Sequence, residues 1–268
     1  AKAKNLYDNG YRYIGRYLTG TYGGGISKAL TVEEANIILD AGLRFFPIYQ
    51  TSSNSESYFT LERGTYDAEA AITASINLGL PKDTIIYFAV DFDAMDYQIT
   101  DSIIPYFEKV YETVSGSGYK VGVYGARNVC SRVAKAGYSC SSFVGDMSTG
   151  FSGNLGFKIP DNWAFSQFAN LEGSKALGTG DGRIEIDKNA FSGRDQGVGE
   201  LNIAPKKAIY VLPGYMGSRL YDSNGEEYWA DQDELEDDIT DYILKGELSN
   251  KKDILRLDKN GENSKLHT

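Results

Sequence analysis

The sequence contains a single histidine, His267, and two cysteines, Cys130 and Cys140, among its 268 residues. Neither the number nor the spacing of these residues fits a zinc site, so the sequence predicts no metal and no cofactor. Two packed thiols are the simpler state for the cysteines, and a disulfide in an oxidising compartment is the alternative. Acid–base chemistry in this chain must therefore fall to carboxylates or tyrosine.

Long apolar runs and basic clusters are also missing. No stretch of about 18 or more apolar residues occurs, which predicts no membrane span, and no signal-peptide pattern opens the chain. The net charge is −10, which argues against nucleic acid. Residues 1–15 have the pattern of the back half of a helix that runs into a strand. We therefore expect that a first strand and an export signal precede it, and that the protein is secreted or associated with the cell wall.

Apolar, β-branched and aromatic runs alternate with helical patterns along the first 198 residues. Capping residues support the helices: Thr31 and Glu34 form a capping-box pair and Gly42 ends that helix. Further helices are predicted from about 67 to 78, 100 to 114 and 127 to 136. The predicted strands are Tyr11–Leu18, Leu43–Gln50, Thr84–Asp93, Tyr119–Ala126, Ser142–Met147, Trp163–Phe168 and Arg183–Asp187.

This alternation predicts an α/β fold of parallel βαβ units. Polar residues stand at the carboxyl end of nearly every predicted strand, as they do where a (β/α)8 barrel builds its active site, and no glycine-rich phosphate loop supports a nucleotide-binding sheet. We therefore predict a TIM-barrel-like domain over 1–198 whose first strand is missing. An open barrel exposes two strand edges, so self-association through them is an expectation. The candidate site residues are Arg16, Tyr49, Gln50, Asp91, Asp93, Tyr124, Asp146, Gln167 and Asp187.

The segment YFAVDFDA places Asp91 and Asp93 one residue apart at the end of a predicted strand. If the strand continues through them, both side chains point to the same face, and repulsion raises the pKa of one carboxyl. A protonated and an ionised carboxyl are the pair that cuts glycosidic bonds. The alternative is structural: one aspartate caps the following loop or pairs with Arg16. The glycine-rich loop Ser148–Phe157 is either a wall of the same cleft or an ordinary connection.

Several long motifs carry a resemblance: YRYIGRYLTG, FFPIYQ, YFAVDFDA, VGVYGARNVCSRV, FVGDMSTGFSGNLGF and IDKN. Together they resemble the bacterial glycoside-hydrolase-like barrel domain related to family 25 lysozymes, over residues 5–198. The resemblance implies action on peptidoglycan or a related glycan. It implies that Asp91 orients the acetamido group of the substrate, that Asp93 stands at the position of the general acid, and that Asp187 is the aspartate of the last strand.

The chain departs from the lysozyme pattern at two places. Asp93 replaces a glutamate, and its side chain is shorter by one methylene; a misplacement on this scale costs about a hundredfold in rate. The aspartate of the first strand has no counterpart. The leading hypothesis is thus a glycosidase of the lysozyme type, and the alternative is a glycan-binding module without catalysis.

The region after Gly197 differs in composition. Residues 199–205 are predicted as a linker, and 206–268 as a separate segment. The stretch AIYVLPGYMGSRLYDSNGEEYW resembles the opening strand and oxyanion-hole loop of lipases of the lecithin:cholesterol acyltransferase type, which implies that backbone N–H groups near Tyr215 and Met216 hold an oxyanion. No G-x-S-x-G nucleophile motif follows, so we expect a truncated α/β-hydrolase segment without esterase activity. In the alternative hypothesis, the barrel targets this fused lipase.

Overall fold

The computed structural model describes residues 1–21, 25, 27–202, 221–222 and 266–267. The chain divides into two compact units, Ala1–Lys206 and Lys207–Thr268. In the second unit the described residues form β8 (Tyr221–Asp222), which pairs antiparallel with β9 (Leu266–His267). Tyr215 and Met216, the predicted oxyanion-hole residues, lie outside the described residues.

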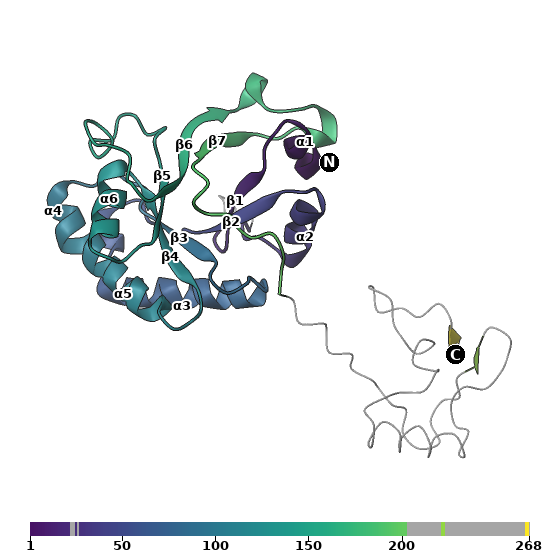
Figure 1. The fold of residues 1–268 in the computed structure, drawn as a ribbon, viewed down its shortest axis with the longest axis horizontal. Coiled ribbons are helices and arrows are strands. Elements are labelled where there is room, and N and C mark those ends of the chain that lie inside the picture. The colour runs from purple at the N-terminus through teal and green to yellow at the C-terminus, as the bar shows by residue number, and fades with distance from the viewer. Residues whose placement is uncertain (22–24, 26, 203–220, 223–265, 268) are drawn as a thin grey trace, which may run out of the picture. The chain divides into compact units, whose positions relative to one another are not determined.

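The first unit is a mixed α/β fold built on one curled seven-stranded sheet of half-barrel shape (Figure 1). Strands β1 to β6 follow one another in chain order and pair in parallel, and β7 pairs antiparallel with β6. The strands are β1 (Tyr13–Tyr17), β2 (Arg44–Tyr49), β3 (Ile85–Ala89), β4 (Lys120–Gly125), β5 (Ser141–Val144), β6 (Trp163–Leu171) and β7 (Ile186–Phe191).

Helices connect the first five strands, as predicted. Thr31 Oγ1 accepts the N–H of Glu34, and Gly42, with φ 82°, follows the helix end, which confirms the predicted start and stop of this helix. The helices are α1 (Lys2–Asp8), α2 (Val32–Asp40), α3 (Leu61–Asn77), α4 (Asp96–Gln98), α5 (Ile104–Val114) and α6 (Arg127–Lys135), with a π-helical turn, η2 (Ile99–Ile103), between α4 and α5, and 3₁₀ turns η1 (Glu56–Tyr58), η3 (Gly173–Lys175) and η4 (Gly180–Gly182).

The alternation ends after β5. No helix separates β5 from β6 in the structure, and a loop over 145–162 makes this connection. Strand β7 returns beside β6, so the prediction of a parallel last strand is wrong. Both cysteines are free thiols. None of the described helices is long and apolar enough to cross a membrane.

Neighbouring residues of a strand point to opposite faces of the sheet. Because consecutive residues here are apolar, both faces are covered by apolar side chains. Phe45 and Phe46 are adjacent and both buried: Phe45 packs in the layer between sheet and helices, while Phe46 lies on the concave side. The rings of Phe46 and Phe165 stack with their centroids 3.8 Å apart. Strands β2 and β6 are not neighbours in the sheet, so this contact requires the sheet to curl.

Side chains also bring the two end strands together. The ring of Tyr13 on β1 lies 4.2 Å from that of Phe191 on β7. The amide of Asn5, on α1, donates to the carbonyl oxygens of Leu177 and Gly182 in the β6–β7 connection, at 3.3 and 2.9 Å. These contacts join the two ends of the open sheet by packing and side-chain hydrogen bonds. Self-association through the edges of β1 and β7 stays a prediction.

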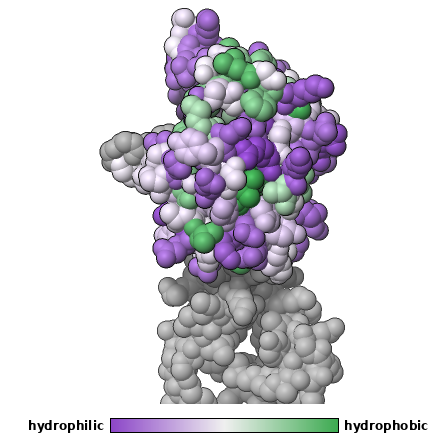
Figure 2. Space-filling model, turned by 90° about the vertical axis from the view of Figure 1, so that its left-hand side faces the viewer, coloured by the Kyte–Doolittle hydropathy of each residue, from purple (hydrophilic) through white to green (hydrophobic). Residues whose placement is uncertain are grey.

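Hydrophobic residues on the face that carries α4 and α6 occur in separate groups among polar ones (Figure 2). Three exposed apolar side chains, Met95, Leu155 and Phe157, belong to the loops after β3 and β5. Parallel strands deliver these loops to one edge of the sheet, where their carboxyl ends meet.

Replacing Phe165 by alanine tests the concave core. We expect the Phe165→Ala variant to lose about 3–5 kcal/mol of unfolding free energy, because a buried aromatic ring leaves a cavity. Phe168→Ala is the matched control, since it makes the same change on the same strand at a side chain that is 49% exposed. It should stay within about 0.5 kcal/mol of the wild type. Urea unfolding measures both, and equal losses would contradict this account of the core.

Candidate functional site

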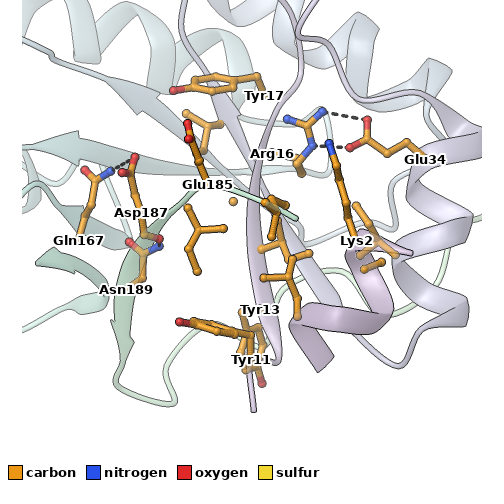
Figure 3. Close-up of a pocket in the computed structure, with 18 of the residues that line it drawn as sticks. Lys2, Tyr11, Tyr13, Arg16, Tyr17, Glu34, Gln167, Glu185, Asp187 and Asn189 are labelled. Atoms are coloured by element: carbon orange, nitrogen blue, oxygen red, sulfur yellow. Dashed lines mark hydrogen bonds and ion pairs between the residues drawn. The ribbon is translucent and has the colours of Figure 1, made fainter. Parts of the chain in front are cut away.

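A cleft of about 1040 Å³ opens at the carboxyl ends of the parallel strands and extends between β1 and β7. Six of the nine predicted first-unit site residues line it: Arg16, Gln50, Asp91, Tyr124, Gln167 and Asp187. The sequence did not single out Lys2, Tyr11, Tyr13, Glu34, Glu185 and Asn189, which line it as well. Figure 3 shows Gln167, Asp187 and Asn189 on one wall and the Arg16–Glu34 pair on the other, with Tyr17 and Tyr13 at opposite ends.

One wall of the cleft is a hydrogen-bonded chain of three side chains. Tyr124 donates its hydroxyl hydrogen to Gln167 Oε1 at 2.7 Å, and Gln167 Nε2 donates to Asp187 Oδ2 at 2.8 Å. Strand β7 runs antiparallel to β6, with Asn189 opposite Gln167, so Asp187 lies two residues from the partner of Gln167 and on the same face of β7. Asp187 and Asn189 share the cleft face of β7 by strand alternation, and Ile184, Glu185 and Ile186 line the cleft where the chain enters the strand. Alternation from Asp187 is the signal that would have identified Asn189.

Residues that follow β2 and β3 form another part of the mouth. Gln50 Nε2 donates to Asp91 Oδ2 at 2.9 Å, and the N–H of Asp91 donates to the carbonyl oxygen of Ser53 at 2.8 Å. Strand β3 ends at Ala89, so Asp91 and Asp93 lie in the loop beyond it. Strand alternation therefore does not apply to this pair, and the prediction that both aspartates face the same way is wrong.

Asp93 faces a different partner. Its Oδ1 accepts the hydroxyl of Ser152 at 2.8 Å and the N–H of Gly153 at 3.4 Å, and Asp93 does not line the cleft. Partial burial would raise the pKa of Asp93, but the hydrogen bonds from Ser152 and Gly153 outweigh it and hold the pKa below the ordinary value. The expected repulsion does not raise the pKa of this carboxyl. Asp93 holds the β5–β6 loop in place, whereas the structural alternative had an aspartate cap the following loop or pair with Arg16, which instead pairs with Glu34.

The pKa of Asp187 moves in the other direction. Partial desolvation in the cleft raises it above the ordinary value, the bond from Gln167 opposes that rise, and the charge of Glu172 adds to it. Burial also raises the pKa of Tyr124, and the charges of Asp91, Tyr17 and Asp187 raise it further. The Tyr124 hydroxyl therefore stays protonated. Asp187 binds a proton more readily than an ordinary aspartate does.

Two predicted site residues are held away from the cleft. Tyr49 is buried, and its hydroxyl donates to Asp67 Oδ1 at 3.1 Å. Its neighbour Gln50 reaches the cleft, so the prediction of Tyr49 as a ligand residue is wrong. Asp146 lies 2.6 Å from Arg127 Nε and accepts the hydroxyl of Ser166 at 2.6 Å. It does not line the cleft either.

Asp67, which accepts the hydroxyl of Tyr49, is the centre of a buried hydrogen-bond network. Asp67 on α3 is fully buried, and Arg63 Nε lies 2.8 Å from its Oδ1. The hydroxyls of Tyr58 and Tyr106 donate to Asp67 Oδ2 at 2.5 and 2.7 Å. Burial, followed by the bond to Asp67, raises the pKa of Tyr58 to about 12. A buried carboxylate with this many partners fixes α3 and α5 against β2.

Arg16 lines the cleft but is already paired. Its Nε and one terminal nitrogen each lie 2.8 Å from an oxygen of Glu34, in a two-point pair across the cleft wall. The described residues include no group of three or more histidine, cysteine, aspartate or glutamate side chains that could hold a metal ion. The cleft lining offers carboxylates, amides and tyrosine hydroxyls.

Comparison with known proteins identifies the family. The Rv2525c-like, glycoside hydrolase-like domain matches residues 4–191. The chain belongs to this family. Two relatives from Bacillus subtilis (strain 168) are similar in sequence: uncharacterized protein YbfG is 51% identical over 219 residues, and uncharacterized protein FadG is 45% identical over 209. These matches cover 78% and 77% of this chain but 29% and 36% of the relatives, so the chain spans about a third of their length.

The same fold occurs in a solved structure. The Mycobacterium tuberculosis Tat-secreted protein Rv2525c, in complex with HEPES, superposes with a TM-score of 0.61 at 18% identity, over 74% of this chain and 94% of that one. A second crystal form of that protein, with L-tartrate, gives a TM-score of 0.58 over 71% and 89%. This likeness supports the curled sheet. The roles of individual residues come from the geometry of this chain.

The contacts of Asp93 predict the effect of removing its side chain. Asp93→Ala should lower the free energy of unfolding by about 1–2 kcal/mol, since charge-assisted hydrogen bonds contribute on this scale, and should speed hydrogen exchange over 150–157. Because the folded-state pKa is lowered, this contribution is present at neutral pH and is lost as the pH falls through the folded pKa. The variant and the wild type should therefore converge in acid. Unchanged exchange in the loop would contradict the assigned role.

Proposed function

We propose that this domain acts on bacterial cell-wall glycan, with peptidoglycan as its substrate, in the cleft between Gln50–Asp91 and Gln167–Asp187. The observation that carries the proposal is a pair of carboxylates, Asp91 and Asp187, that line one cleft from different parts of the sheet. Asp187 has a raised pKa within a chain of hydrogen bonds, while Asp91 accepts an amide hydrogen from Gln50. Glycosidic bond cleavage uses two carboxyl groups in different protonation states.

The roles follow from these environments. Asp187 is the proton donor to the leaving oxygen, because its raised pKa keeps a larger protonated fraction. Asp91 is the carboxylate that faces the positive charge of the sugar in the transition state. Tyr124 and Gln167 orient Asp187 and can bond sugar hydroxyls. Asp93, the acid that the lysozyme resemblance implies, fits this role less well, because its lowered pKa and its bonds to the β5–β6 loop keep it ionised.

The proposed location is outside the cell. The Mycobacterium tuberculosis protein with the same fold is Tat-secreted, and the two similar Bacillus subtilis proteins come from a bacterium. The cleft itself is wide and open at the strand ends, as a site for a polymer must be.

A second candidate is a glycan-binding module without turnover. Two observations favour it: Asp93 is committed to the loop, and this chain matches about a third of each longer relative. In this case the domain brings a fused catalytic segment, such as the lipase suggested by the tail, to the wall.

Release of reducing ends from purified peptidoglycan tests the proposal, with sedimentation of the protein with insoluble wall as a parallel measurement. The chain as given should release reducing ends, and Asp187→Asn should lower the rate at least about a hundredfold, the scale of a lost general acid. Asp91→Asn should lower it comparably. Asp93→Glu distinguishes the roles: a gain in rate would assign the acid to position 93.

Asp101→Asn is the matched control, because it makes the same Asp-to-Asn change at an exposed residue that does not line the cleft. It should leave release and sedimentation unchanged. Sedimentation without release in any variant would replace the hydrolase by the binding module. If neither release nor sedimentation occurs, the proposal of a wall glycan ligand is wrong.

A further inference from the structure

The segment that follows β2 holds Asp91 at two points. Gln50 Nε2 donates to Asp91 Oδ2 at 2.9 Å, and the carbonyl oxygen of Ser53 accepts the N–H of Asp91 at 2.8 Å. The first contact orients the carboxylate and the second holds the backbone. Ser53 is buried, so the second contact is shielded from water. The place of Asp91 in the cleft therefore depends on where residues 50–53 lie.

Thr51 lies between these two contacts in the chain, but it does not line the cleft. Its Oγ1 is 2.6 Å from the hydroxyl of Tyr58 and accepts a terminal N–H of Arg63 at 2.9 Å. Tyr58 gives its only hydroxyl hydrogen to Asp67 Oδ2 at 2.5 Å, so Thr51 is the donor in its bond to Tyr58. The Thr51 hydroxyl thus donates one hydrogen bond and accepts another, which fixes its orientation.

Both neighbours of Gln50 are tied to one buried carboxylate. Tyr49, which precedes Gln50, reaches Asp67 directly, because its hydroxyl donates to Asp67 Oδ1 at 3.1 Å. Thr51, which follows Gln50, reaches Asp67 through Tyr58. Asp67 is fully buried. The backbone of Gln50 is therefore held on both sides, and its side chain loses less conformational entropy when it donates to its carboxylate partner in the cleft.

Resting on the proposed function, we propose that Thr51 is a positioning residue of the cleft: its hydroxyl ties residues 50–53 to the buried Asp67, and through this segment it sets the place of Asp91. Valine has nearly the shape of threonine, so Thr51→Val removes both hydrogen bonds of the side chain and keeps its apolar contacts. The carboxylate that faces the sugar cation is then held by a looser segment. A misplacement of about 1 Å costs up to about a hundredfold in rate, even when the substitution is far from the reacting atoms.

The rate of reducing-end release from peptidoglycan tests this role. In Thr51→Val we expect kcat to fall about tenfold while the apparent KM stays within about twofold of the wild type, because the interaction that is lost acts on the transition state. Thr51→Ser keeps the hydroxyl, and its kcat should stay within about twofold of the wild type. An unchanged kcat in Thr51→Val, with release by the wild type, would overturn the inference and leave the proposed function in place.

Tyr106→Phe is the matched control for a merely structural effect. It removes a hydroxyl that donates to the same oxygen of Asp67, at 2.7 Å, and leaves both bonds of Thr51 intact. Its thermal midpoint should fall by about 2–4 °C, the shift that the loss of one buried hydrogen bond gives in a domain of this size. Its kcat should not change. An equal loss of kcat in Tyr106→Phe and Thr51→Val would show a general loosening of the network and would also overturn the inference.

The side-chain amide of Gln50 gives a second measurement that does not depend on turnover. Its NMR signal, identified by its absence in Gln50→Ala, should move to the position of a solvated glutamine in Thr51→Val and stay in place in Thr51→Ser and Tyr106→Phe. A signal that does not move in Thr51→Val would overturn the inference whatever the glycan assay shows. If the wild type releases no reducing ends but the signal moves as expected, the proposed hydrolase is wrong and the coupling of Thr51 to Gln50 is upheld.

Discussion

The antiparallel pairing of β7 with β6 is the constraint on which the arrangement of the mouth depends. Parallel strands collect their carboxyl ends at one edge, and an antiparallel neighbour brings its amino end to that same edge. Asp187, next to the first residue of β7, thereby lies opposite Asn170 near the end of β6, where its side chain accepts the amide of Gln167. Asp187 therefore reaches the site without an α-helical crossover between β6 and β7.

This geometry brings Asp187 to the cleft by a route that differs from the predicted one. The sequence suggested a parallel strand that ends at Asp187, whereas the structure has an antiparallel strand that begins at Ile186. Both place the residue at the mouth. Hydrophobic pattern identifies a strand without giving its direction, because the side-chain period of two is the same for both directions.

Other predictions succeeded or failed for local reasons. The helix cap at Thr31 could be found because capping depends on residues three positions apart. Gln50 and its buried neighbour Tyr49 could have been separated by alternation along β2, given the apolar Ile48 on the cleft side. The divergence of Asp91 and Asp93 could not be found in this way, because it depends on where β3 ends and on Ser152, which is distant in sequence. Membership of the glycoside hydrolase-like family fixes the type of fold and leaves the division of tasks among the aspartates to local contacts.

The hydrogen bonds of the mouth each close a segment of chain when the protein folds. Gln167 and Asp187 are 20 residues apart in the chain, while Gln50 and Asp91 are 41 apart. The entropy of closing a flexible loop grows only with the logarithm of its length, so doubling the separation costs about 0.6 kcal/mol. The bond from Tyr124 to Gln167, which spans 43 residues, has nearly the same closure cost as the Gln50–Asp91 bond. The closure entropies of these three hydrogen bonds are therefore similar. The mouth forms when the curled sheet that carries all these residues assembles.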